Sequence, residues 1–246
     1  HWGPLLWLHC RQRQQLRRCI ELSSQIGAPW VSIIIPVLNE QAALAQRKEN
    51  LANLHQAGAE IIIVDGGSSD RTQALIPDFS RGVADSPPGR ALQMNVGAAR
   101  STTDLLLFLH IDTELTADAL ERLKTLKKEP HIWGRFDVRF SEGSGIFRII
   151  AASMNWRSRL SRIATGDQAI FVSRALFQSV NGFPEQPLME DIELSRRLNC
   201  RGTYFPLRER VTISPRYWHK HGVIKSIFRM WSLRLQYYLG ATAESI

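Results

Sequence analysis

Residues 104–113 read D-L-L-L-F-L-H-I-D-T, an apolar run that ends on a histidine and an aspartate. Its central Leu and Phe residues do not alternate with polar ones, which is typical of a strand covered on both faces in a parallel sheet. Helices must supply that cover, so the run predicts an α/β fold with this strand near the centre. Ligands of open α/β sheets bind outside the carboxyl ends of the strands, so we expect chemistry at His110 and Asp112.

Two earlier apolar runs have the same form. Residues 31–37 precede Asn39 and Glu40, and residues 61–64 precede Asp65. Each polar residue alone can simply end a strand and cap the following helix. Three such ends in one chain, followed later by a Glu-Asp pair, favour a ligand site at one edge of the sheet.

The spacing of apolar residues predicts the other elements. Strands are expected over 133–140 and 169–172, and helices over 39–58, 90–99, 116–128, 147–160, from about 190 onward, and over 222–239. The last helix has apolar residues along one face, with Lys225 and Arg229 on another. We expect the apolar face to pack on the domain, and the alternative is a basic face turned toward a membrane.

Three segments have features of anion or acid-base chemistry. The paired glycines in D-G-G-S-S-D-R-T (65–72) let the backbone approach a ligand, and a helix beginning there would favour phosphate. Arg90, at the start of a helix, can hold a phosphate with two N–H groups, or it can simply be solvated. Glu190 and Asp191 lie in a first helical turn, where the helix dipole alone favours acids, and the same field keeps Asp191 ionised, as a general base requires.

The composition limits the classes of partner. The net charge of +8 comes from the ends of the chain, because residues 1–30 carry +3, residues 201–246 carry +6, and the middle nets −1. This pattern favours an anionic surface or a phosphate-bearing ligand and argues against a domain built wholly for nucleic acid. Residues 1–29 mix Trp and Leu with four Arg, as in a basic amphipathic helix on a membrane or an ordinary appended helix.

The cysteines and the hydropathy predict the compartment. Three cysteines without C-x-x-C spacing indicate neither a zinc site nor a disulfide framework, so we expect a reducing, cytoplasmic location. No apolar run approaches the roughly 20 residues that span a bilayer, and no signal-peptide core is present before Cys19. The length and the 44% hydrophobic content are consistent with one domain.

Five segments, taken in order, resemble the family 2 glycosyltransferases with the GT-A fold. They are I-I-I-P-V-L-N-E (33–40), V-D-G-G-S-S-D-R-T (64–72), G-R-A-L-Q-M-N (89–95), L-H-I-D-T (109–113) and M-E-D (189–191). The strongest likeness is to a bacterial subgroup that also has T-G-D-Q-A-I-F (165–171) and P-L-M-E-D (187–191). The resemblance covers about residues 30–240.

This resemblance implies a Rossmann-like, mixed and mostly parallel sheet flanked by helices, in a single domain of residues 30–240 after the extension 1–29. It implies inverting, metal-dependent transfer of a sugar from a UDP- or GDP-sugar to an unidentified hydroxyl acceptor. Asp112 would bind Mn²⁺ or Mg²⁺, and Asp191, with Glu190 beside it, would be the base. The implied donor-binding residues are Pro36, Asn39, Glu40, Asp65, Gly66, Arg90, His110 and Ile111.

Two departures from the family pattern bear on these expectations. Gly66 replaces a carboxylate that in the family often contacts the nucleotide base. His110 replaces the first Asp of the D-x-D metal motif. Imidazole suits Mn²⁺ better than Mg²⁺, so this replacement favours Mn²⁺ if His110 binds the metal at all. One alternative is therefore a protein that binds sugar nucleotides without transferring the sugar. A second is a basic protein that acts on nucleic acid or a membrane, although we expect no nucleic acid and keep an anionic membrane surface as a peripheral, cytoplasmic partner. The enzyme interpretation requires Asp65, Asp112 and Asp191 to meet at one cleft.

Overall fold

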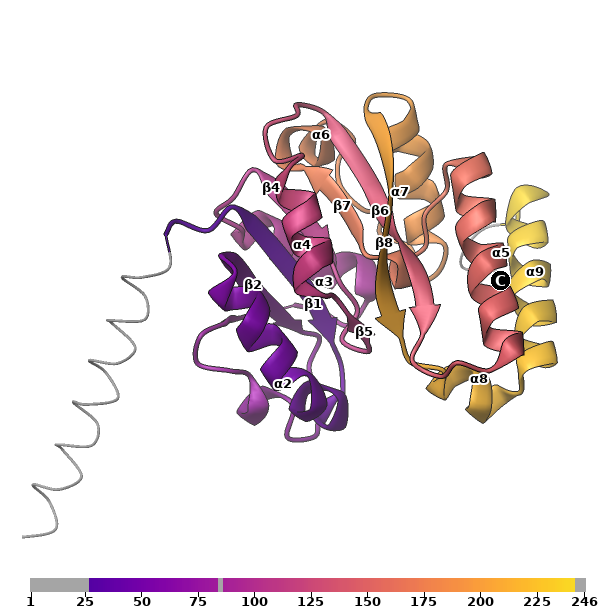
Figure 1. Cartoon of the computed structure of the whole chain (residues 1–246), viewed down its shortest axis with the longest axis horizontal. Helices are drawn as coiled ribbons and strands as arrows, with labels where there is room; N and C mark the ends of the chain where they lie inside the picture. Colours follow the sequence, from indigo (N-terminus) through magenta and orange to yellow (C-terminus); the bar gives the residue numbers. More distant parts are fainter. Residues whose placement is uncertain (1–26, 84–85, 242–246) are drawn as a thin grey trace, which may run out of the picture.

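The computed structural model describes residues 27–83 and 86–241, whose strands form one sheet in the order β3-β2-β1-β4-β7-β6-β8-β5 (Figure 1). The strands are β1 (Val31–Val37), β2 (Ala59–Asp65), β3 (Arg81–Val83), β4 (Leu105–Phe108), β5 (Thr113–Glu114), β6 (Ile132–Phe140), β7 (Ile170–Ser173) and β8 (Thr203–Ile213). Strands β1, β2, β3 and β4 pair in parallel, as do β6 and β8, whereas β7 is antiparallel to both its neighbours and β5 is antiparallel to β8. The expected mixed, mostly parallel sheet is confirmed.

Helices cover both faces of this sheet. They are α2 (Gln41–Gln56), α3 (Arg90–Arg100), α4 (Ala117–Lys124), α5 (Gly145–Ser161), α6 (Arg174–Ser179), α7 (Glu190–Asn199), α8 (Arg216–His221) and α9 (Val223–Tyr238), with single 3₁₀ turns η1 (Gln73–Leu75) and η2 (Gly166–Gln168). Helices α2, α4 and α5 bury their apolar residues in the core on one face, and α3, α6 and α7 do so on the other. The two cores explain why the central strands are apolar on both sides.

The run at 104–113 supplies the central strand β4, which lies between β1 and β7. Leu105 and Leu107 belong to the core on one face, and Leu106 and Phe108 to the core on the other, all at most 2% exposed. The strand is shorter than the apolar run, because the chain leaves the sheet after Phe108 and turns through residues 109–112. This turn places His110 and Asp112 between the end of β4 and the start of β5.

The expected helix after the glycine pair does not form beyond the single turn η1. The backbone of Ile76 is extended (ψ 125°), as is usual for a residue before a proline, and Pro77 follows it. Helix α4 is also shorter than expected and ends at Lys124. Residues 66–72 form a loop, which is held by side chains of the loop itself and by Asn39 and Gln73 beside it.

The apolar face of α9 corrects a second expectation. Val223, Ile227 and Met230 pack against the core, as expected for part of the helix. Five other apolar residues of the helix are exposed, however, from 58% for Tyr238 to 73% for Phe228. These exposed residues are Ile224, Phe228, Trp231, Leu235 and Tyr238. Among the described helices, none is long and apolar enough to cross a bilayer.

Candidate functional site

A cavity of about 720 Å³ lies beyond the carboxyl ends of β1 and β4, bounded by the first turns of α3 and α7 and by α8 and α9. Eight of the eleven residues predicted for the site line it. They are Pro36, Glu40, Arg90, His110, Ile111, Asp112, Glu190 and Asp191. The cavity therefore gathers polar groups from distant segments, and two of the three strand ends, those of β1 and β4, contribute to it.

Three predicted residues, Asn39, Asp65 and Gly66, do not line the cavity. Asn39 binds the loop instead, since its Oδ1 accepts a hydrogen bond from the Ser69 backbone N at 2.8 Å. Asp65 is fully buried, and its carboxylate accepts hydrogen bonds from the Gln73 side chain (2.6 Å) and the Ser68 backbone N (3.0 Å). The expectation that Asp65, Asp112 and Asp191 share one cleft is thus wrong for Asp65.

The hydrogen bonds of Asp65 also decide its ionisation. Burial by itself raises the pKa of this carboxyl, but hydrogen bonds from Ser68, Gln73 and the Gly67 backbone outweigh it and hold the pKa below its ordinary value. A carboxylate with this many donors keeps its charge. It fixes the loop 66–72 that follows β2.

Gln93 of α3 lines the cavity and was not predicted as a site residue. Its Nε2 donates to the carbonyl oxygens of Val37 and Val64, both at 2.8 Å, and so ties the ends of β1 and β2 together. A Cβ at Gly66 would lie 3.0 Å from the Gln93 amide carbon. The small residue where the family often has a carboxylate therefore leaves room for the Gln93 amide.

Asp191 and Glu190 begin α7, after Met189 in a left-handed conformation (φ 63°). The Asp191 carboxylate accepts hydrogen bonds from the backbone N–H groups of Gly166 (3.0 Å) and Ile192 (2.8 Å), which fix its orientation. Glu190 is 5% exposed and faces Arg90, with 3.6 Å between Oε1 and Nη1. Burial raises the pKa of Glu190, Asp191 raises it further, and Arg90 opposes both.

The turn 165–168 brings a second acidic group, Asp167, into the cavity lining. Its Oδ1 lies 3.4 Å from Nδ1 of His110, whose Nε2 is buried and has no hydrogen-bond partner among the residues that the structure describes. Burial acts to raise the pKa of Asp167, but His110, Arg90 and Arg234 outweigh it and leave the pKa below its ordinary value. A Cβ at Gly166 would lie 2.4 Å from the His110 ring, so the turn and the ring are in close contact. The motif T-G-D-Q was the available signal for this turn.

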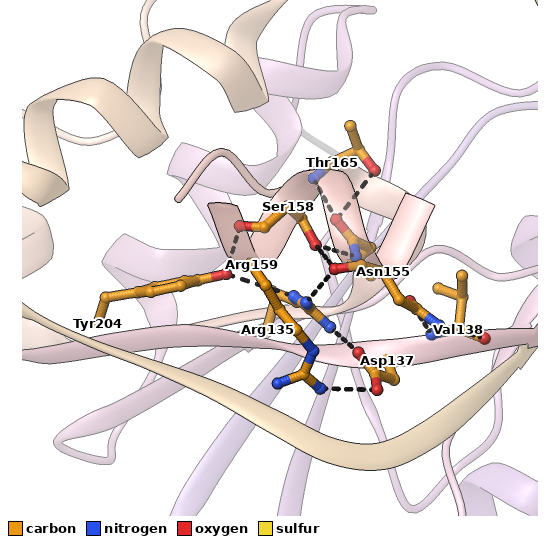
Figure 2. Close-up of polar contacts among 9 residues, drawn as sticks. Arg135, Asp137, Val138, Asn155, Ser158, Arg159, Thr165 and Tyr204 are labelled. Carbon is orange, nitrogen blue, oxygen red and sulfur yellow. Dashed lines mark hydrogen bonds and ion pairs between the residues drawn. The ribbon is translucent and has the colours of Figure 1, made fainter. Parts of the chain in front are cut away.

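A buried polar network anchors that turn to α5 and β6 (Figure 2). Gln168 donates to the Ser158 hydroxyl (2.9 Å) and accepts from the Thr165 backbone N (3.2 Å). The carbonyl of Ser158 in turn accepts from the Tyr204 hydroxyl at 3.0 Å. Arg135, which is fully buried, donates to the Asn155 carbonyl at 2.9 Å and pairs with Asp137. The backbone that holds Asp191 and Asp167 is thus rigidly placed.

Helices α8 and α9 close the cavity with residues outside the eleven predicted for the site. Tyr217, Trp218, Met230, Leu233 and Arg234 line it. Burial lowers the pKa of Arg234, whereas the charges of Asp191 and Asp167 raise it. The Arg234 guanidinium therefore lines the same cavity as these two carboxylates, close enough to interact with their charges.

The carboxylates of Asp112 and the nearby Glu40 fit a divalent cation that takes its other ligands from a substrate. Within residues 27–83 and 86–241, no three His, Cys, Asp or Glu side chains gather into a metal site of their own. Asp112 does line the cavity, near enough to Glu40 to act on it, because burial raises the pKa of Glu40, Arg216 lowers it, and Asp112 raises it again. Mg²⁺ and Mn²⁺ commonly bind one or two carboxylates together with diphosphate oxygens and water.

Comparison with known proteins places this architecture. The probable glycosyltransferase YdaM of Bacillus subtilis is 27% identical over 206 residues, which are 72% of this chain and 49% of YdaM, so the chain spans about half the length of that relative. The structure of TarS 1-349 of S. aureus in complex with UDP-GlcNAc has a TM-score of 0.60 at 18% identity, over 75% of this chain and 58% of that one. The mannosyltransferase PcManGT of Pyrobaculum calidifontis, in complex with GDP-Man and Mn²⁺, has a TM-score of 0.56 at 17% identity, over 80% and 63%.

These two structures share the GT-A fold with this chain. The model of the family described as glycosyl transferase family 2 matches residues 32–180, which hold β1 to β7 and most of the cavity's polar lining. The chain belongs to glycosyl transferase family 2.

Proposed function

We propose that this protein transfers a sugar from a nucleoside-diphosphate sugar, with UDP or GDP as the nucleotide, to the hydroxyl of an acceptor that is not yet identified. One observation carries the proposal: a single cavity holds Asp112, the Arg90–Glu190 pair and the oriented carboxylate of Asp191. The donors bound in the structures of TarS and PcManGT support it, since these are a UDP-sugar and a GDP-sugar.

The donor would lie along the wall formed by the ends of β1 and β4. Pro36, Glu40, His110 and Ile111 supply that wall, and Arg90 supplies two N–H groups for phosphate oxygens. Asn39, Asp65 and Gly66 would not touch the donor. They shape the loop 66–72 and the position of Gln93 beside it. Asp112 would hold Mn²⁺ or Mg²⁺, which supplies neutralising charge to the departing diphosphate when bound.

Asp191 would take the proton from the acceptor hydroxyl as that oxygen attacks the anomeric carbon. The new bond forms on the side of the sugar opposite the diphosphate, so the configuration inverts and no covalent enzyme intermediate is needed. The N–H groups of Gly166 and Ile192 keep the carboxylate oriented for this step. Glu190 stands beside it, and Arg234 faces it.

The Asp191→Asn variant tests the base. We expect it to fold normally and to bind donor, but to lose transfer by roughly 10²- to 10⁴-fold, because the amide cannot accept the proton. The measurement is release of nucleoside diphosphate from a UDP- or GDP-sugar, with water in place of the unidentified acceptor. Glu193→Gln is the matched control, since Glu193 lies in the same first turn but does not line the cavity. Unchanged transfer by Asp191→Asn would remove Asp191 from this role.

The alternative of a protein that binds sugar nucleotides without transfer is favoured by one observation, His110 at the first position of the metal motif. Hydrolysis of a nucleotide sugar that depends on added Mn²⁺ and occurs without acceptor would decide against it. Binding to nucleic acid would show a steep salt dependence that survives Asp112→Asn. Position on the cytoplasmic side of a membrane remains part of the proposal, and its support is the basic C-terminal part of the chain.

A further inference from the structure

Helices α5 and α9 both carry apolar residues on their outer sides. On α5, Ile149, Trp156 and Leu160 are between 65% and 71% exposed. Together with the five exposed residues of α9, they form what we call the α5–α9 face: Ile149, Trp156, Leu160, Ile224, Phe228, Trp231, Leu235 and Tyr238. An apolar patch of this extent on a soluble domain marks an interaction surface.

The two helices lie together at one end of the molecule (Figure 1). Burial, together with the positive charge of Arg234 on α9, lowers the pKa of Arg157 on α5 to about 10, and Tyr238 also acts on Arg157. The inner side of α9 lines the cavity through Met230, Leu233 and Arg234. The α9 part of the α5–α9 face is therefore the outer side of a wall of the proposed active site.

The charge of this region has one sign. Helices α5 and α9 contain six Arg or Lys residues and no Asp or Glu. Three of the six, Arg148, Lys225 and Arg229, are exposed, and no carboxylate in residues 27–83 and 86–241 forms a salt bridge with them. Two copies of this face would bring like charges together, which disfavours a dimer through it.

The residue types on the α5–α9 face are those typical of a surface that contacts a lipid bilayer. Trp and Tyr are the residues enriched where a protein meets the boundary between lipid headgroups and acyl chains, and Lys and Arg beside them attract anionic lipid. Helix α9 spaces Ile224, Phe228, Trp231, Leu235 and Tyr238 so that they follow one side of a 16-residue helix. A helix with this pattern lies in the plane of the interface rather than across the bilayer.

We propose that the α5–α9 face seats the protein on an anionic phospholipid bilayer, with α9 lying in the interface and the cavity directly behind it. This inference rests on the proposed membrane location and not on the proposed chemistry. The cavity would then meet acceptors at the lipid surface.

The experiment is co-sedimentation of the full chain with vesicles, without donor or acceptor. We expect it to bind phosphatidylcholine vesicles that contain about 30% phosphatidylglycerol, and to bind pure phosphatidylcholine at least roughly tenfold more weakly. The double variant Phe228→Ser/Trp231→Ser removes two exposed aromatic rings that do not line the cavity. We expect it to lose binding by at least about tenfold. Its fold is checked by an unchanged thermal transition and donor-induced shift.

A matched pair of charge reversals separates a local contact from net charge. Arg229→Glu and Lys128→Glu change the charge equally, and both positions are exposed, but only Arg229 adjoins the face. We expect roughly tenfold weaker binding for Arg229→Glu and little change for Lys128→Glu. Equal losses for the two variants would overturn the proposal.

Three further results would also overturn it. One is failure of the wild-type chain to bind the anionic vesicles. Another is a dimer, seen by sedimentation, that Phe228→Ser/Trp231→Ser dissociates, because a second copy would then cover the face. The third is binding that survives this double variant but is lost on reversal of Arg17 and Arg18, which would place the lipid contact in the N-terminal extension. None of these results depends on sugar transfer, so failure here leaves the proposed chemistry standing.

Discussion

Glu190 and Asp191 are adjacent in the first turn of α7, but their carboxylates have different surroundings. Asp191 receives two backbone N–H groups and lies opposite Arg234, whereas Glu190 is buried against Arg90. The helix dipole acts on both and cannot separate them. The difference comes from their tertiary partners, which orient the carboxylate of Asp191 and bury that of Glu190.

The raised pKa of Glu190 gives a prediction about stability and pH. In the unfolded chain this carboxyl titrates near its ordinary value of 4.5, and in the folded protein it titrates higher. The folded state therefore binds the proton more tightly, and wild-type stability falls as the pH rises from 4.5 through the raised pKa.

Glu190→Gln removes this titration. We expect the variant to have a higher Tm than the wild type at about pH 8. The difference should vanish at about pH 4, where Glu190 is mostly protonated and both side chains are neutral. Differential scanning calorimetry across this range checks it. A gain that is the same at both ends of the range would mean that packing, and not ionisation, causes the difference.

Sequence motifs identified most residues that line the cavity, but not the direction in which each side chain points. Asp65 follows an apolar strand just as Asp112 does, yet its carboxylate binds Gln73 and Ser68 in its own loop. Arg234 was not predicted as a site residue, because Asp191 and Asp167, which act on it, are distant in sequence. Pairings of this kind are set by the tertiary fold and leave no local pattern.

At the scale of elements, α3 lies against β1 and β2 with Gly97 at the contact. A Cβ at Gly97 would lie 2.4 Å from Cγ2 of Ile34, which is fully buried and has no room to move. Alanine is normally better than glycine inside a helix by about 1 kcal/mol. Here the steric clash outweighs that preference.

We expect Gly97→Ala to lower the free energy of unfolding by roughly 1 to 3 kcal/mol, the usual cost of overpacking a core. Urea unfolding followed by circular dichroism measures it. Gly145→Ala is the control, because a Cβ at Gly145 meets no atom within 4 Å and α5 begins there. If both variants were equally stable, the close packing of α3 on the sheet would not be a source of stability.

Periodicity predicted the elements whose pattern is local and missed those that depend on distant pairing. Strand β8 was not expected, since it contains Pro206 and the charged residues 208–210. It forms because β6 pairs with it over most of its length, with an irregularity between Arg135 and Asp137. Helix α9 was predicted correctly as a helix, but its apolar pattern alone could not tell which side meets the core and which meets solvent.

At the scale of the whole molecule, ligand binding to the cavity must raise the stability of the entire domain, since only the folded state has a cavity. At about 100 times Kd this stabilisation is about 2.7 kcal/mol. For a chain of this size we expect a rise in Tm of roughly 5 to 10 °C.

The measurement is a thermal-shift series with UDP, GDP and their sugars, each with Mn²⁺, with Mg²⁺ and with neither. The nucleotide that gives the larger shift identifies the donor class. Asp112→Asn should abolish the extra shift that the cation gives and leave the shift from nucleotide alone. The absence of any shift with all of these ligands would contradict the proposed donor site.

The family resemblance predicted a mixed, mostly parallel sheet, but the order of its strands could not be predicted from the strands themselves. Apolar runs indicate that strands are buried, but they do not say that β7 runs antiparallel between β4 and β6. That reversal lets the chain return to the cavity through the turn 165–168 and again at α7. The mixed topology is thus what brings late segments of the chain to the edge formed by the early ones.

Helix α9 lines the cavity with one side and has exposed apolar residues on the other. Phe228 projects outward from it, and Arg234, less than two turns further along, faces Asp167 and Asp191 on the inside. A tilt or slide of α9 would therefore displace the Arg234 guanidinium and the exposed aromatic rings of the helix together. If the α5–α9 face rests on a lipid surface as proposed, a shift of α9 on that surface would also move the Arg234 guanidinium relative to Asp167 and Asp191.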